Sequence, residues 1–158
     1  MCCGALITNI ILKDTVARLR PFESVELYRQ WWEAVGSPKE DGFSFPSGHV
    51  TAAASGMTAL CLMRGKKLIA PSVIIVVLMG ISRNYLMAHY PSDVLFAMII
   101  GLASGYAAWM ITLLIYRILE EHDDIGLFAF ILDFDLPIDR LPLPSINLPG
   151  QYKGRHEK

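Results

Sequence analysis

The chain has 158 residues, of which 53% are hydrophobic and 18% are charged, and its formal net charge is −1. Ordinary soluble domains carry roughly 25% charged residues, so this composition, with a mean hydropathy of +0.40, favours a membrane protein. The near-zero net charge excludes the overall positive field that attracts nucleic acid, and the sequence carries no nucleic-acid motif, so we expect no nucleic-acid partner.

Apolar stretches at 1–12, 47–63, 68–82 and 94–116 organise the chain. The last has no charged residue and exceeds the roughly 20 residues that a helix needs to cross a bilayer. The two middle stretches are shorter, and we predict that they form a helical hairpin that turns at residues 64–67, where basic side chains reach the membrane surface. We therefore expect an all-α fold, an integral-membrane helical bundle with three spanning helices plus a partial one at the N-terminus.

The first stretch, Met1–Leu12, is too short to span a membrane, because a helix of that length reaches only about 18 Å. It also lacks the basic start and the small-residue cleavage site of a signal peptide. It is typical of the last half of a spanning helix, which predicts a fragment or a start-site truncation. We expect a membrane domain at 1–119 and a tail at 120–158. Prolines disfavour a long helix in that tail: Pro137, Pro142, Pro144 and Pro149.

The basic turn at 64–67 predicts the orientation of the chain. It carries three positive charges and no negative one, so the positive-inside rule places it in the cytoplasm. Residues 13–45 and 83–93 then lie on the outer side of a cell membrane that the chain crosses several times, and the tail is cytoplasmic. Gly101 and Gly105 have the spacing that lets helices approach closely, although chance produces it as often in an apolar helix.

The first polar cluster runs from Lys13 to Pro21. Lys13 and Arg20 are seven residues apart, nearly two helical turns, so on a helix both point the same way, and we expect Pro21 to end that helix. Two cations that converge on one point suit a dianionic phosphate, whose oxygens match the guanidinium fork. The alternative is an ordinary belt of snorkelling cations at a helix end.

The second cluster is Pro46-Ser47-Gly48-His49. Ser47 is predicted to be the N-cap of the following helix, and Gly48 removes a side chain where a ligand must approach closely. The helix start offers free N–H groups and a positive dipole end, which attract an anion. His49 lies in the first turn, where it could give a proton to a leaving oxygen. The alternative is a capped helix start with an incidental histidine.

The third cluster combines Arg83 with His89, Pro91 and Asp93. Pro91 favours the first helical position, so His89 should precede the helix and Asp93 should lie in its first turn. A carboxylate there could reach one imidazole nitrogen, fix the tautomer and leave the other nitrogen free as a nucleophile. Arg83 adds another guanidinium group that can bind phosphate oxygens. The alternative is a helix capped by Asp93 beside an uninvolved histidine.

All three clusters are predicted to face the same side of the membrane. Together they hold three cations, a helix N-terminus and two histidines with one carboxylate partner, which is the set that phosphoryl transfer through a phosphohistidine requires. The nucleophile and the acid would lie on opposite sides of the phosphorus. No cluster of Asp and Glu for divalent metals is evident, so we expect a metal-independent reaction without a cofactor.

The order and internal spacing of these clusters resemble the three signature motifs of the type 2 phosphatidic acid phosphatase family. The matching motifs are Lys13-x6-Arg20-Pro21, Pro46-Ser47-Gly48-His49 and Ser82-Arg83-x5-His89-x3-Asp93. They span residues 13–93, and the last apolar stretch extends the resemblance to about residue 117. The tail lies outside it.

The resemblance implies an all-helical membrane enzyme, usually with six spanning helices and an outward-facing site. It implies His89 as nucleophile, Asp93 as its partner and His49 as general acid. The phosphate ligands that it implies are Lys13, Arg20, Ser47, Gly48 and Arg83. Its typical substrates are phosphatidic acid, phosphatidylglycerol phosphate and undecaprenyl pyrophosphate. Relative to the family pattern, about two and a half helices upstream of the first motif are absent.

The leading hypothesis is a phosphatase that acts on a lipid phosphate or pyrophosphate. One alternative is a non-catalytic membrane fragment that keeps the motifs, as the short first stretch suggests. A second is a soluble enzyme with the same phosphate pocket, resembling vanadium haloperoxidases and soluble acid phosphatases, which the uncharged stretch at 94–116 disfavours. A third is a phosphotransferase that hands phosphate to an acceptor other than water.

Overall fold

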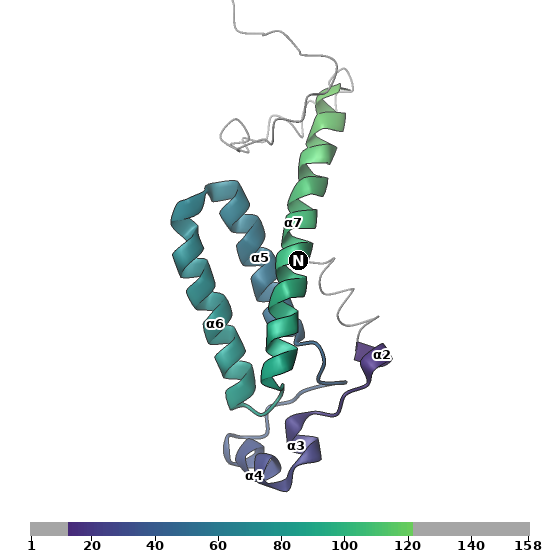
Figure 1. Ribbon diagram of the computed structural model, residues 1–158, viewed down its shortest axis with the longest axis vertical. Helices are drawn as coiled ribbons and strands as arrows, with labels where there is room; N and C mark the ends of the chain where they lie inside the picture. Colours follow the sequence, from purple (N-terminus) through teal and green to yellow (C-terminus); the bar gives the residue numbers. More distant parts are fainter. Residues whose placement is uncertain (1–12, 122–158) are drawn as a thin grey trace, which may run out of the picture.

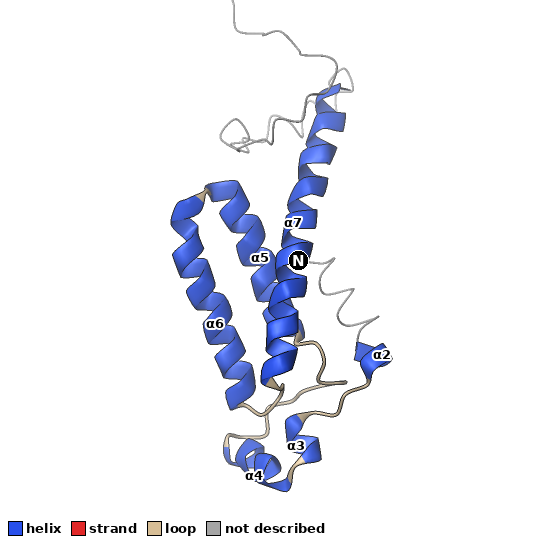
Figure 2. Ribbon diagram, viewed as in Figure 1, coloured by secondary structure: helices blue, strands red, loops and turns tan. Residues whose placement is uncertain are grey.

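The computed structural model describes residues 13–121, and that part of the chain is helical and contains no strand (Figure 2). Three long helices dominate it, and short helical segments precede and connect them. The segments are α2 (Lys13–Val16), α3 (Pro21–Ser24), α4 (Glu26–Ala34), α5 (Gly48–Arg64), η2 (Lys66–Leu68), α6 (Ile69–Tyr85) and α7 (Pro91–Glu121). The partial helix and the tail that the sequence predicted lie outside the described residues.

Two of the long helices are long and apolar enough to cross a membrane, over 66–85 and 91–115. Both leave large apolar side chains exposed along their length, as expected for surfaces that face lipid rather than water. The predicted all-helical membrane bundle is thereby confirmed. Helix α5 has 17 residues and is not one of these two candidates, so its role as a third span stays a prediction.

Helices α5 and α6 form the predicted hairpin, and α7 lies beside it (Figure 1). The turn depends on Gly65, which follows the last residue of α5 with a φ of 90°, a backbone conformation that side chains disfavour. The short η2 helix then reverses the chain into α6. The basic turn therefore lies at the opposite end of the bundle from the starts of α5 and α7 (Figure 1).

Close contact between α5 and α7 depends on two glycines. A Cβ atom added at Gly101 would lie 2.4 Å from the Cβ of Ala54, and one at Gly105 would lie 2.6 Å from the carbonyl oxygen of Ser55. Neither position has room for a side chain, so the small-residue spacing of this pair is a packing feature of the structure and not a chance occurrence. It holds the two helices whose first turns carry the polar clusters.

A small apolar core lies near the end of the bundle where α5 and α7 start. Val50 from α5 and Val94 and Ala97 from α7 are buried together. Helix α6 approaches them at Gly80, where an added Cβ would lie 2.7 Å from a methyl group of Val94. This packing fixes the starts of α5 and α7 and the end of α6 relative to one another.

The segment from Lys13 to Pro21 does not form the continuous helix that the sequence analysis expected. Helix α2 ends at Val16, because Ala17 adopts a left-handed backbone conformation with a φ of 46°. Pro21 begins α3 instead of ending a helix, in keeping with the preference of proline for the first helical position. The chain then folds through α3 and α4 below the starts of α5 and α7 (Figure 1).

Helices α3 and α4 are held by aromatic contacts. The rings of Phe22 and Trp32 stack with centroids 4.6 Å apart, which joins the two short helices. The indole N–H of Trp31 donates to the carbonyl oxygen of Tyr85 at 2.9 Å, and the two rings meet edge to face. Helix α4 is thereby tied to the end of α6, beside Arg83.

Candidate active site

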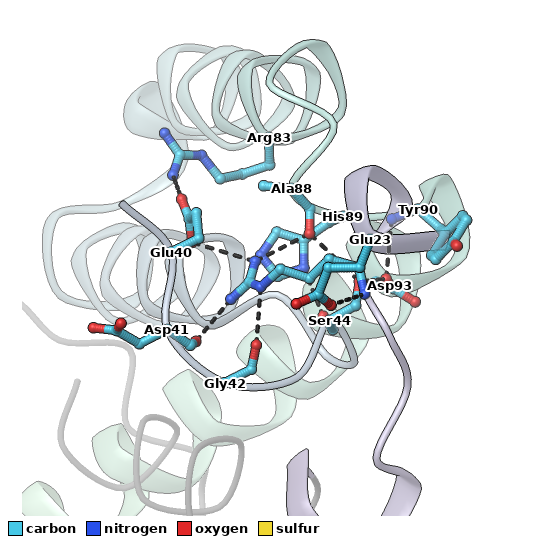
Figure 3. A network of polar contacts seen from close by, with 11 residues as sticks. Glu23, Glu40, Asp41, Gly42, Ser44, Arg83, Ala88, His89, Tyr90 and Asp93 are labelled. Atoms are coloured by element: carbon cyan, nitrogen blue, oxygen red, sulfur yellow. Dashed lines mark hydrogen bonds and ion pairs between the residues drawn. The ribbon is translucent and has the colours of Figure 1, made fainter. Parts of the chain in front are cut away.

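The three polar clusters meet at one end of the bundle. The second cluster begins α5, while the third spans the end of α6 and the start of α7. The backbone N–H of Ser47 donates to the carbonyl oxygen of Asp93 at 3.4 Å, which joins the two helix starts. Figure 3 shows Arg83, His89 and Asp93 within one network of polar contacts. The predicted convergence of these segments is therefore a property of the fold.

His89 precedes α7, as predicted, and only 3% of its surface is exposed. Its Nδ1 atom lies 2.6 Å from the carbonyl oxygen of Ser44. A carbonyl oxygen only accepts hydrogen bonds, so Nδ1 must carry the hydrogen. In the neutral ring the lone pair then belongs to Nε2, which is the atom that can act as a nucleophile.

The protonation state of His89 follows from its surroundings. Burial, followed by the positive charge of Arg20, lowers the pKa of the imidazole from 6.5 to about 4, although the contact with the Ser44 carbonyl opposes the shift. The ring is therefore neutral at pH 7. A neutral imidazole is the form in which histidine attacks phosphorus.

Asp93 lies in the first turn of α7 and is fully buried. Its Oδ2 atom accepts hydrogen bonds from the hydroxyl of Ser44 at 2.5 Å and from the backbone N–H of Tyr90 at 3.0 Å. Its Oδ1 atom lies 2.6 Å from a guanidinium nitrogen of Arg18. The sequence analysis expected the carboxylate to reach an imidazole nitrogen, whereas the structure places the Ser44 carbonyl on His89, because residue 44 lies between the two side chains.

Arg20 is buried to 1% exposure, and each nitrogen of its guanidinium has an acceptor. Nε donates to the carbonyl oxygen of Gly42 at 2.9 Å, Nη2 to that of Asp41 at 2.8 Å, and Nη1 to that of Ala88 at 3.0 Å. These bonds tie the loop before α5 to the loop before α7. Arg20 thus supplies a fixed positive charge and also holds the walls of the site together.

Glu40 joins two of the predicted phosphate ligands. Its carboxylate lies 2.9 Å from Nη1 of Arg83 and 3.3 Å from Nη1 of Arg20, so one anion is shared by two guanidinium groups (Figure 3). The sequence analysis missed this residue. The acidic pair Glu40 and Asp41 just before the second cluster was the available signal, but composition alone does not distinguish a solvated loop carboxylate from one that lies between arginines.

Two of the predicted phosphate ligands, Arg83 and Ser47, keep buried donors without partners in the described part of the chain. Nε of Arg83 and the hydroxyl of Ser47 are buried and form no hydrogen bond with the described part of the chain. Ser47 occupies the N-cap position of α5, as predicted, but its hydroxyl does not cap the helix. Buried donors without partners are costly, so this pair favours a site that binds an anion.

The remaining predicted residues lie around these groups. Lys13 is partly buried, and burial followed by the charge of Arg20 lowers the pKa of its ammonium group. His49 is exposed in the first turn of α5, within electrostatic reach of Arg83, Glu40 and Lys13. Gly48 is the first residue of that helix.

The family model of the PAP2 superfamily matches residues 1–117 of the chain. The chain belongs to the PAP2 superfamily. It is also 31% identical over 97 residues to an undecaprenyl-diphosphatase from Sulfolobus acidocaldarius, an alignment that covers 61% of this chain and 45% of that protein. The chain thus spans less than half the length of this curated relative. No solved structure matches it.

All eight predicted site residues of this PAP2 chain fall within its described part. Residues 13–121 contain no group of three or more His, Cys, Asp or Glu side chains that could hold a metal ion. The network also includes Arg18, Ser44, Tyr90 and Glu40, which lie outside the motif positions. On a continuous helix, Arg18 would lie off the face that Lys13 and Arg20 share. The broken helix instead turns it toward Asp93.

Proposed function

We propose that this chain is a membrane phosphatase that hydrolyses the phosphate monoester or pyrophosphate of a lipid through a phosphohistidine on His89, without a metal ion. The observation that carries the proposal is the contact of Nδ1 with the Ser44 carbonyl at 2.6 Å. It leaves the lone pair on Nε2 of a neutral, buried imidazole. Membership of the PAP2 superfamily and the similarity to an undecaprenyl-diphosphatase support a lipid phosphatase in general.

The phosphate would bind among the cations and free donors of the site. Arg83 offers a buried Nε that has no partner among the described residues, and Ser47 offers a buried hydroxyl at the start of α5. Lys13 and Arg20 add positive charge, and Gly48 leaves the first turn of α5 open to a phosphate oxygen. Such groups stabilise the charge on the equatorial oxygens of the transition state.

The reaction would take place in two steps. Nε2 of His89 forms a bond to phosphorus while the bond from phosphorus to the leaving oxygen breaks, and His49 gives a proton to that oxygen. Water then attacks the phosphohistidine, His49 takes a proton from it, and the bond from Nε2 to phosphorus breaks to release inorganic phosphate. His49 is exposed whereas His89 is buried, and an exposed histidine suits a group that exchanges protons with water.

The position of the site supports a lipid as the proposed substrate. The polar end of the bundle lies where two apolar helices, over 66–85 and 91–115, end or begin. A site at that level can receive the phosphate of a lipid whose chains remain in the bilayer. We place the protein in the cell membrane, crossing it several times, with this end on the extracytoplasmic side, as the basic turn at the other end favours.

Phosphate release tests the proposal directly. The chain in detergent is assayed against phosphatidic acid, phosphatidylglycerol phosphate and undecaprenyl pyrophosphate, with a chelator present. We expect turnover that survives chelation and disappears in His89→Ala. Quenching in alkaline denaturant, in which the P–N bond of a phosphohistidine survives, traps labelled phosphate on the protein and separates the phosphohistidine mechanism from direct attack by water. A metal requirement, or full turnover in His89→Ala, would show the mechanism to be wrong.

A further inference from the structure

Asp93 carries a buried negative charge whose partners come from three separate segments. Ser44 in the loop before α5, Tyr90 in the loop before α7 and Arg18 between α2 and α3 all donate to its carboxylate. Two of these contacts, at 2.5 Å and 2.6 Å, are at the short end of the range for hydrogen bonds to charged groups. None of the hydrogen bonds to Asp93 in the described part of the chain comes from the imidazole of His89.

Ser44 is the junction between Asp93 and His89. It is fully buried, and its backbone N–H donates to the carbonyl oxygen of Arg18 at 2.8 Å. Its hydroxyl hydrogen goes to the carboxylate of Asp93, since a carboxylate can only accept, and its carbonyl oxygen accepts the hydrogen on Nδ1 of His89. Backbone and side chain together therefore fix this one residue against both partners.

Arg18 holds the other oxygen of Asp93. Its Nη1 atom also donates to the hydroxyl of Ser92 at 2.8 Å, and its guanidinium lies 3.9 Å from the centre of the Tyr90 ring. The side chain of Arg18 is 38% exposed, whereas that of Asp93 is fully buried. Arg18 thus covers the carboxylate from the solvent side and balances its charge, and removal of one partner would leave a buried charge alone.

We propose that Ser44 and Arg18 are positioning residues for the nucleophile, and that Asp93 acts on His89 through Ser44 rather than by direct contact. In this arrangement Asp93 anchors the hydroxyl of Ser44, which fixes the carbonyl that selects the Nδ1–H tautomer. Arg18 balances the charge of the carboxylate and holds it in place. The proposal rests on the proposed function for its kinetic readout, but the tautomer of His89 can be measured without turnover.

A double-mutant cycle tests whether Ser44 and Asp93 act as one unit. We expect Ser44→Ala to lower kcat by about tenfold to a hundredfold with KM nearly unchanged, the effect of losing one hydrogen bond to a charged group. In the Asp93→Asn background the same substitution should lose most of that effect, because the anchor is already weakened. Ser72→Ala is the matched control, as Ser72 is also buried but its hydroxyl contacts Cys61, near the basic turn and away from Asp93.

Arg18→Gln, with Arg29→Gln as the control, extends the cycle to the second residue. Arg29 is exposed, and its contacts are to Glu26 and Phe22 on the short helices. We expect Arg18→Gln to lower kcat by about tenfold and to be non-additive with Asp93→Asn. Additive effects of Ser44→Ala and Asp93→Asn, or unchanged kcat in both single variants, would overturn the positioning role.

Nitrogen-15 NMR of labelled histidine gives the test that does not need turnover. In the parent chain His89, assigned by its loss in His89→Gln, should show the Nδ1–H tautomer with a slowly exchanging proton. Ser44→Ala should speed that exchange, and Ser72→Ala should not. An Nε2–H tautomer in the parent chain, or unchanged exchange in Ser44→Ala, contradicts this inference alone, whereas turnover that survives His89→Ala contradicts the proposed function instead.

Discussion

The site has a side around His89, the proposed nucleophile, and a side around Arg83 and Ser47, two proposed phosphate ligands. This nucleophile side and this phosphate side differ in how many of their polar groups have hydrogen-bond partners. On the nucleophile side, both oxygens of Asp93, the hydroxyl of Ser44 and Nδ1 of His89 all have close partners within the chain. On the phosphate side, Nε of Arg83 and the hydroxyl of Ser47 are buried and have no hydrogen-bond partner within residues 13–121. The hydrogen bonds of the nucleophile side are already formed, whereas the phosphate side has donors that are available to a ligand.

This difference matches what the two sides would have to do. A nucleophile must hold one tautomer and one orientation before the substrate arrives, so its contacts should be permanent. A phosphate site must exchange its anion in every turnover, so its donors should be free or held by a partner that can be displaced. Glu40, which bridges Arg20 and Arg83, is that kind of partner, since its carboxylate occupies the space between two of the expected phosphate ligands.

The largest expected effect outside the nucleophile itself is the loss of the proton donor. His49→Ala should lower kcat/KM for a lipid phosphate by about a hundredfold to ten-thousandfold, the usual contribution of general acid catalysis. The same substitution should cost far less with an aryl phosphate, whose leaving oxygen needs no proton. Steady-state kinetics on both substrates measure the difference. Equal losses on the two substrates would mean that His49 binds phosphate and does not protonate the leaving group.

The acid side of the pH profile probes the nucleophile side. An ordinary histidine would be mostly protonated at pH 5, whereas burial and the charge of Arg20 lower the pKa of His89 to about 4. In the proposed mechanism the neutral form is the nucleophile, so activity should be present above that pKa and should be lost as the pH falls through it. At pH 5 this retains about thirtyfold more neutral imidazole than an unshifted histidine would.

The measurement is kcat/KM from pH 4 to pH 8, together with the NMR titration of His89. The same lowered pKa should make the folded chain less stable in acid solution. Since the folded chain binds this proton less readily than the unfolded chain, stability should fall as the pH drops from about 6.5 toward 4. A titration midpoint for His89 near 6.5 would show that the ring is not sheltered as the structure indicates.

The sequence predicted the long helices and the meeting of the clusters because those features depend on strong local signals. The long uncharged stretch predicted α7, and Pro91 predicted where that helix starts. The basic run that contains Gly65 predicted the turn. The motif spacing then placed the predicted site residues at one end of the bundle. These signals need no knowledge of how distant segments pack.

The parts that the sequence did not predict depend on long-range packing. No glycine or proline at Ala17 predicts the break in the helix there. This break turns Arg18 toward Asp93. The role of Ser44 is carried largely by its backbone carbonyl, which every residue possesses, so no side-chain pattern could identify it. Glu40 reaches its arginines across more than 40 residues of sequence in one case, beyond any local pattern.

The smallest expected effect sharpens the comparison on the phosphate side. Glu40→Gln removes the charge that Arg20 and Arg83 share, so an inorganic anion should bind more tightly there. We expect the inhibition constant of inorganic phosphate or vanadate to fall by about tenfold, the equivalent of about 1.4 kcal/mol. Asp41→Asn is the matched control, because it also removes one negative charge and lies next to Glu40 in the sequence. Asp41 is exposed, and it contacts Arg20 through its carbonyl oxygen and not through its carboxylate. If both variants shift inhibition equally, the effect is one of general charge, and Glu40 does not hold the place of the substrate phosphate.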